Sequence, residues 1–247
     1  MTTYREQAIV LRKVDYGEAD RVYTLLTRGH GKLGVIAKGA RRASSKVGPS
    51  LDLFAQVDVL LARGRSLDVV AQAQRLPRPR LPAEVERTAH AALIAELVER
   101  ATEERTPLGP LYELTAAALD EVALEADPRR ACAYFVGAFL EALGYGLQVS
   151  ACAGCGAALS PRPAPFSARA GGFSCPDCQD PGAPETSVAA LKVLRVVASG
   201  DLATYRRLLL EPALMAEVEE VLWAQLEHHL DRRLRSLQFI RQMRGAH

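Results

Sequence analysis

The stretch "LFAQVDVLLARGRSLDVVAQAQRLPRPRLP", residues 53 to 82, contains the point at which one kind of structure gives way to another. Residues 53–63 and 67–75 are rich in β-branched and aliphatic side chains, as strands are, and the "GRS" between them has the length of a hairpin turn. Residues 76–82 carry three prolines, which cannot donate to a strand ladder. We therefore expect a β domain to end near residue 80 and a different architecture to follow it.

Three more strand patterns precede this stretch. Residues 5–14 alternate in polarity, residues 21–27 are β-branched and aromatic, and residues 31–39 begin and end with glycine. Five short strands within about 75 residues predict a small closed barrel of the OB type. An SH3-like barrel has the same number of strands and stays open as an alternative.

Downstream of the prolines the hydrophobic period becomes helical. In the segment 128–143, Asp127 suits the N-cap, Pro128 the first helical position and Gly144 the C-terminal stop. Its "ACAYFVGAFLEALG" is apolar on most sides, which predicts the central helix of a bundle. The other expected helices are 84–105, 110–125, 186–199, 202–210 and a long one that starts at Pro212.

We therefore predict an α+β multidomain protein with an N-terminal five-stranded OB-type β-barrel, followed by an α-helical domain with a four-cysteine zinc-ribbon insert. The expected boundaries are 1–80 for the barrel, 81–150 for the first part of the helical domain, 151–183 for the insert and 184–247 for the second helical part.

Four of the five cysteines lie in "CAGCGAALSPRPAPFSARAGGFSCPDC", residues 152 to 178. They form two Cys-x-x-Cys pairs that are 19 residues apart, a spacing typical of zinc ribbons. Each pair can make a tight turn with both sulfurs directed at one ion, and Gly156 suits such a turn. The predicted zinc ligands are Cys152, Cys155, Cys175 and Cys178.

The ligand set also indicates what kind of zinc site this is. Four thiolates complete a tetrahedral shell, whereas a catalytic zinc keeps one position for water or substrate. A nucleobase deaminase needs a His-x-Glu element, which neither His30 nor His90 supplies. We predict a structural zinc; a zinc hydrolase or deaminase is the alternative, and it requires an open coordination position.

Charge is distributed unevenly along the chain. Residues 1–80 contain 15 Lys or Arg and 7 Asp or Glu, a net charge of +8, so the remaining residues carry −6 of the overall +2. This imbalance favours an anionic partner for the barrel. A solvated basic surface without a partner is the alternative.

The basic residues themselves gather in "GKLGVIAKGARRASSK", residues 31 to 46. Strand alternation predicts that Lys32 and Lys38 lie on the same face of the sheet. Such a surface can neutralise successive phosphates with little base preference. The predicted DNA contacts are Lys32, Lys38, Arg41, Arg42 and Lys46, with Arg12, Lys13, Arg63 and Arg65 as further candidates.

Stacking residues are scarce in the same domain. Its aromatic side chains are Tyr4, Tyr16, Tyr23 and Phe54, and at least two of them should lie in the core. We therefore expect contacts with the phosphate backbone to dominate over base stacking.

Several function classes lack their motifs. "GHGKLG" resembles part of a P-loop, but Leu33 stands where Ser or Thr is needed, and neither Gly-x-Ser-x-Gly nor His-Glu-x-x-His occurs. We accordingly predict that the protein is not an enzyme. No secretory signal is recognisable and the longest apolar run, residues 131–140, is too short to span a bilayer, so a cytoplasmic location without a membrane partner is expected.

The stretch "VDYGEADRVYTLLTRGHGKLGVIAKGARR", residues 14 to 42, resembles the N-terminal signature of the RecO family of bacterial recombination and repair proteins, and the order of barrel, helical domain and zinc insert matches that family as well. The resemblance implies a nucleoid-associated, non-enzymatic DNA-binding protein of the RecF pathway. Such a protein binds single- and double-stranded DNA, anneals complementary strands without ATP and helps load recombinase onto DNA coated with single-strand binding protein (SSB).

The implied partners are RecR and the acidic C-terminal tail of SSB. The family's functional residues carry over to Lys32, Lys38, Arg41 and Arg42 as DNA contacts and to the four cysteines as zinc ligands. An RNA-binding or translation-associated factor with an OB barrel and a zinc ribbon is the alternative function.

Overall fold

The computed structural model describes residues 2–107, 109–179, 182–230 and 234–245. Contacts between Cα atoms group the chain into two compact units, Met1–Pro128 with Leu234–His247, and Arg129–Arg233. The change from strands to helices near residue 80 is present, but by these contacts the first two helices and the last one belong to the same unit as the barrel. Within the described residues, no helix combines the length and the apolar character needed to cross a membrane.

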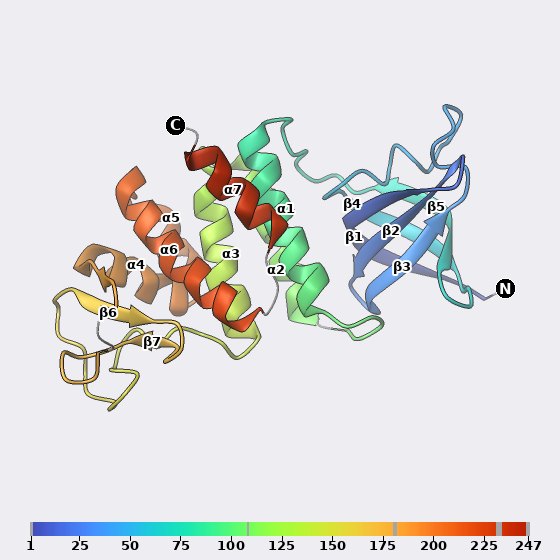
Figure 1. The fold of residues 1–247 in the computed structure, drawn as a ribbon. Coiled ribbons are helices and arrows are strands. Elements are labelled where there is room, and N and C mark those ends of the chain that lie inside the picture. Colours follow the sequence, from blue (N-terminus) through green and yellow to red (C-terminus); the bar gives the residue numbers. More distant parts are fainter. Residues whose placement is uncertain (1, 108, 180–181, 231–233, 246–247) are drawn as a thin grey trace. The chain divides into compact units, whose positions relative to one another are not determined.

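Five strands close into a barrel in the first unit (Figure 1). Around the barrel they follow the order β1-β2-β3-β5-β4, with β3 and β5 parallel and the other pairs antiparallel. This strand order is that of the OB fold, which confirms the predicted barrel and removes the SH3-like alternative. The strands are β1 (Thr3–Tyr16), β2 (Asp20–Thr27), β3 (Gly31–Ala37), β4 (Gln56–Ala62) and β5 (Asp68–Arg75).

Alternate residues of each strand fill the interior of the barrel, as the sequence pattern predicts. Tyr23, Val35 and Val59, for example, have no exposed surface. Strand β4 begins three residues later than expected, because residues 51–55 turn before it and Phe54 takes a φ of 64°. Strand β1 has an irregularity between Val10 and Arg12, which shifts the register of all later residues of the strand.

Three helices complete the first unit: α1 (Val85–Ala101), α2 (Gly109–Leu124) and α7 (Arg235–Gly245). Helix α7 lies beside α1 (Figure 1). The Glu96 carboxylate of α1 accepts hydrogen bonds from the backbone N–H groups of Arg235 (3.1 Å) and Ser236 (2.9 Å). These N–H groups belong to the first turn of α7 and have no partner within the helix, so Glu96 caps α7 from a neighbouring element.

The second unit contains α3 (Pro128–Ala142), α4 (Val188–Ala198), α5 (Leu202–Arg207), α6 (Pro212–His229) and a three-stranded sheet. The sheet has the order β7-β6-β8 and consists of β6 (Ala164–Ser167), β7 (Gly172–Phe173) and β8 (Glu185–Thr186).

Helix α3 is largely buried, as its apolar sequence predicts. Its Phe135 and Phe139 are fully buried and stacked at 5.5 Å. A Cβ on Gly137 would lie 2.1 Å from Val197 Cγ1, so glycine allows α3 and α4 to approach closely. The long helix expected from Pro212 ends at His229, and α7 is a separate helix of the first unit.

Candidate nucleic-acid interface and metal site

The loop after β3 carries the densest group of basic side chains. Lys38, Arg41, Arg42 and Lys46 are all exposed there. The start of the loop is fixed against the β1–β2 turn, because the Gly39 N–H donates to Asp20 Oδ1 (2.7 Å) and the Arg41 N–H donates to the Ala19 carbonyl (2.9 Å). We call residues 38–46 the basic loop.

One arginine of the basic loop is engaged by an acid. Arg41 Nε lies 3.4 Å from Asp15 Oδ2, and Arg41 Nη1 donates to the Gly17 carbonyl at 3.0 Å. Arg21 donates to the other oxygen of Asp15 at 2.8 Å, and this hydrogen bond lowers the pKa of Asp15. Among the described residues, by contrast, Lys38, Arg42 and Lys46 have no ion-pair partner. Their charges are therefore available to an anionic ligand.

Two candidates on β1 are paired with acids. Arg12 Nη1 lies 3.2 Å from Glu99 Oε1, and Lys13 Nζ lies 2.7 Å from Asp52 Oδ1. Both pairs are solvent-exposed, and exposed ion pairs contribute about 0–1 kcal/mol, so a phosphate can replace the carboxylate at little cost.

The other two candidates come from the β4–β5 connection, residues 63–67. Arg63 lies over the ring of Tyr4, with 5.7 Å from its guanidinium carbon to the ring centre. Arg65 is exposed and has no ion-pair partner among the described residues.

Lys32 has different surroundings from the basic loop. It does lie on the outer face of β3, as alternation predicts, but it is six positions from Lys38, about 20 Å at the usual rise of a strand. Its ammonium group donates to the carbonyl oxygens of Glu99 (2.6 Å) and Thr102, which are the free acceptors at the C-terminal end of α1. A cation at this end of a helix also interacts favourably with the helix dipole. Lys32 thus binds α1, and its role as a DNA contact stays a prediction.

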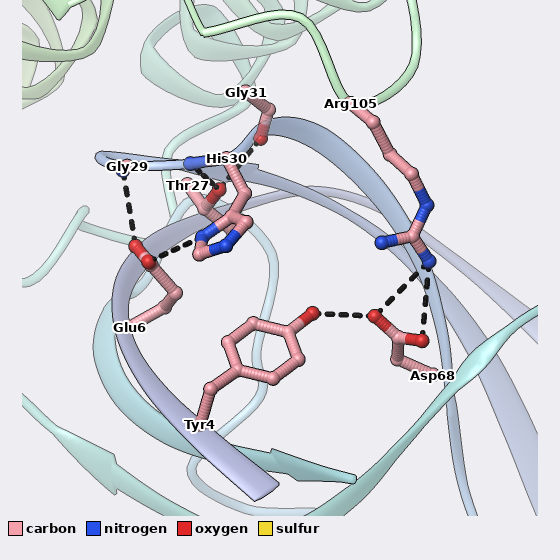
Figure 2. Close-up of polar contacts among 8 residues, drawn as sticks. All are labelled: Tyr4, Glu6, Thr27, Gly29, His30, Gly31, Asp68 and Arg105. Carbon is pink, nitrogen blue, oxygen red and sulfur yellow. Dashed lines mark hydrogen bonds and ion pairs between the residues drawn. The ribbon is translucent and has the colours of Figure 1, made fainter. Parts of the chain in front are cut away.

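The same end of the barrel holds a polar cluster that the sequence reasoning missed (Figure 2). Asp68, which is fully buried, accepts hydrogen bonds from the Tyr4 hydroxyl, from Arg105 Nη2 (3.1 Å to each oxygen) and from the Gly64 N–H (3.0 Å). Burial alone would raise the pKa of Asp68, but these donors outweigh it and lower the pKa. Burial and the neighbouring carboxylate raise the pKa of Tyr4 to about 12.

The β2–β3 turn lies against the same cluster. His30 Nδ1 is 2.6 Å from Glu6 Oε1, and its ring lies 4.9 Å from that of Tyr4 (Figure 2). A Cβ on Gly31 would be 2.0 Å from the Thr106 carbonyl oxygen, so the "GHG" of this turn serves close packing against the α1–α2 loop. The sequence held one usable signal, because Asp68 alternates with the interior residue Val70 and a buried carboxylate needs donors.

The four predicted metal ligands come together in the second unit. The Sγ atoms of Cys152, Cys155, Cys175 and Cys178 all lie within 4.8 Å of one another, and those of Cys155 and Cys175 are 3.8 Å apart. Sulfurs at the corners of a tetrahedron around an ion, each about 2.3 Å from it, are about 3.8 Å apart, so the cluster has the size of a tetrathiolate site.

Local backbone geometry prepares the sulfurs for an ion. The N–H groups of Cys175 (3.3 Å) and Gly154 (3.4 Å) donate to Cys152 Sγ and help to lower the pKa of this thiol to about 6. Hydrogen bonds that the Cys178 thiol donates to Cys155 and Cys175 stabilise its protonated form and raise its pKa to about 12. The four cysteines are therefore positioned to bind a metal ion, and the remaining one, Cys132, is buried in α3.

Comparison with known proteins covers nearly the whole chain. Residues 1–76 match the family model described as Recombination protein O N terminal, and residues 82–238 match Recombination protein O C terminal. The chain belongs to the RecO family. This confirms the resemblance carried by residues 14–42.

Relatives named DNA repair protein RecO agree with this assignment. The protein of Roseiflexus sp. (strain RS-1) is 39% identical over 98% of this chain and 86% of its own length. Those of Desulforudis audaxviator (strain MP104C) and Bifidobacterium longum (strain DJO10A) are 38% and 34% identical, over 98% and 97% of this chain and 98% and 99% of their own lengths. The two RecO family models meet near residues 76–82, the proline-rich stretch at which the strand pattern ends.

Proposed function

We propose that this member of the RecO family is a DNA-binding recombination mediator without catalytic activity. It binds single- and double-stranded DNA, anneals complementary strands without ATP and helps load recombinase onto DNA coated with SSB. The observation that carries the proposal is the basic loop, with three cations that are unpaired within the described chain, on an OB barrel whose relatives are named DNA repair proteins.

Annealing by such a barrel follows from electrostatics. Base pairing supplies the free energy, while repulsion between the two phosphate backbones sets the kinetic barrier. Lys38, Arg42 and Lys46 can each replace a counterion on the backbone, and Arg41 can do so by releasing Asp15. No nucleotide hydrolysis is needed for this step.

The remaining parts of the proposal concern the metal and the partners. The ion bound by the four cysteines is Zn²⁺, with a structural role, because four thiolates leave no position for substrate. The protein partners are RecR and the acidic C-terminal tail of SSB, and the protein acts in the cytoplasm on the nucleoid.

The triple variant Lys38→Ala, Arg41→Ala, Arg42→Ala tests the basic loop. We expect it to bind single-stranded DNA at least tenfold more weakly at low salt and to anneal complementary strands more slowly without ATP. The slope of log Kd against log salt should fall by about two to three, since each lost phosphate contact removes about 0.7–0.9.

A control with the same loss of charge is Arg162→Ala, Lys192→Ala, Arg207→Ala, which lies in the second unit and should bind like the wild type. Equal DNA affinity of the basic-loop variant and the wild type at low salt would contradict the proposal. Stronger binding of RNA than of DNA of the same sequence would favour the RNA-binding alternative instead.

A further inference from the structure

Tyr16 differs from the other aromatic side chains of the barrel segment. Tyr23 is fully buried in the interior, Tyr4 bonds to Asp68 and Phe54 is half-buried, whereas 60% of Tyr16 is exposed. Within the described chain the Tyr16 hydroxyl has no hydrogen-bond partner. Neither packing nor hydrogen bonding inside the barrel accounts for this ring.

The strand register places Tyr16 on the outer face of the barrel, beside a row of apolar side chains. Residues directly opposite in a sheet share a face, and Val14 is opposite Val22, which is opposite Ile36, which is opposite Val69. These residues alternate with the interior residues Tyr23, Val35 and Val70, so they point outward. We call Val14, Val22, Ile36 and Val69 the apolar row; it crosses β1, β2, β3 and β5, and Tyr16 continues it two residues beyond Val14.

The apolar row is partly accessible to solvent. Val14 is 45% exposed and the other three members are half-buried, so a flat apolar group can lie against Val14 and the exposed parts of its neighbours. Four β-branched side chains in a row on the outer face of the barrel are unusual, because the outer face of such a sheet is commonly polar.

Two basic residues follow or precede strands that carry the row. Lys38 follows Ile36 by two residues, and its neighbour Gly39 is hydrogen-bonded to Asp20, the acidic residue opposite Tyr16. Arg65 lies in the loop that leads directly into β5 and Val69. A strand of nucleic acid on the row therefore meets cations for its phosphates and an aromatic ring for its bases.

We propose that Tyr16 and the apolar row form a binding site for the unpaired bases of single-stranded nucleic acid, with a base stacked on the Tyr16 ring. This inference rests on the proposed function for the ligand and adds that the barrel distinguishes unpaired from paired bases. In a duplex the base faces are covered by neighbouring bases, so duplex DNA reaches the basic residues only through its phosphates. Every base has a π-face, so the site selects for strandedness and tolerates any sequence.

The test uses Tyr16→Ala and Tyr16→Phe in the full chain. Affinities are measured for three ligands of equal length: an oligothymidylate, a duplex, and an abasic strand that keeps the phosphates and lacks the bases. We expect Tyr16→Ala to weaken oligothymidylate binding about tenfold and to leave duplex and abasic binding within about twofold of the wild type. Tyr16→Phe should bind all three like the wild type, and the salt dependence of every variant should be unchanged.

The inference is overturned if Tyr16→Ala binds the oligothymidylate like the wild type, since the Tyr16 ring then contributes nothing to binding. Equal losses of affinity for all three ligands overturn it too, because the effect is then electrostatic. A Tyr16→Phe variant that binds the oligothymidylate as weakly as Tyr16→Ala also overturns it, because the hydroxyl group and not the ring is then responsible. If the proposed function itself is wrong, the result is different: the wild-type protein binds none of the three ligands.

Discussion

The contrast between Lys32 and Lys38 shows how two identical side chains six positions apart come to have different roles. Lys32 lies on the outer face of β3 and Lys38 directly follows this strand, but only Lys32 meets the carbonyl groups at the end of α1. We expect Lys32→Ala to lower the free energy of unfolding by about 1–3 kcal/mol, because two acceptors lose their donor and the helix end loses a cation. Lys38→Ala should change it by less than about 0.5 kcal/mol.

Chemical denaturation and DNA binding, measured on both variants, check this prediction. Lys38→Ala should have the larger effect on DNA affinity and Lys32→Ala the larger effect on stability. A Lys32→Ala variant of wild-type stability that binds DNA more weakly than Lys38→Ala would instead make Lys32 a DNA contact, as the family resemblance implies.

Tyr4 gives the polar cluster at the barrel end a measurable pH dependence. Its pKa is raised to about 12 in the folded protein and is about 10 in an unfolded chain. The folded state therefore holds a proton that the unfolded state releases between pH 10 and 12. The stabilisation is fully present below pH 10 and is lost as the pH rises towards 12.

We expect wild-type protein to be about 1–2 kcal/mol more stable than Tyr4→Phe at pH 8, since Asp68 loses a donor in the variant. This difference should shrink when urea unfolding is repeated at pH 11. Tyr16→Phe is the control, because its hydroxyl bonds to nothing in the described chain. A difference that stays constant from pH 8 to 11 would show that the Tyr4 hydroxyl is not bound to the buried carboxylate.

At the scale of elements, the insert with β6, β7 and β8 contains very little regular structure for its length. Its two shortest strands have two residues each, too few to be stable alone. We expect purified protein to contain one zinc ion per chain, and Cys152→Ser or treatment with a strong chelator to lower the melting temperature. Metal analysis and calorimetry measure these effects.

Cys132→Ala is the matched control, because this cysteine lies in α3 away from the ligand set and should leave the zinc content unchanged. DNA binding through the basic loop should survive loss of the metal. Loss of DNA binding from Cys152→Ser protein with an intact barrel would assign a DNA contact to the insert.

For the molecule as a whole, the sequence predicted what depends on neighbours in the chain. Alternation and the prolines of residues 76–82 located the barrel, and Asp127, Pro128 and Gly144 located α3 almost to the residue. Cysteine spacing located the metal site. All of these are local patterns whose period or spacing has a direct structural meaning.

Contacts between distant residues could not be predicted in this way. Glu96 caps a helix that begins 139 residues later, and Arg105 reaches Asp68 from a loop after the barrel. Lys32 was assigned to the basic surface because charge was the only property that the sequence displayed. Its actual neighbours are backbone carbonyl groups at the end of α1. Every residue has such a group, so the residue types do not indicate this contact.

The capping of α7 by Glu96 has a consequence for how the chain is made. The ribosome completes the barrel, α1 and α2 early, but it must add the whole of Arg129–Arg233 before α7 emerges. At about 5–20 residues per second this interval is on the order of ten seconds. During it, the second unit can reach its native contacts as one continuous piece, while the α1 surface that receives α7 stays uncovered. The first unit can therefore be completed only after the whole of the second unit has been synthesised.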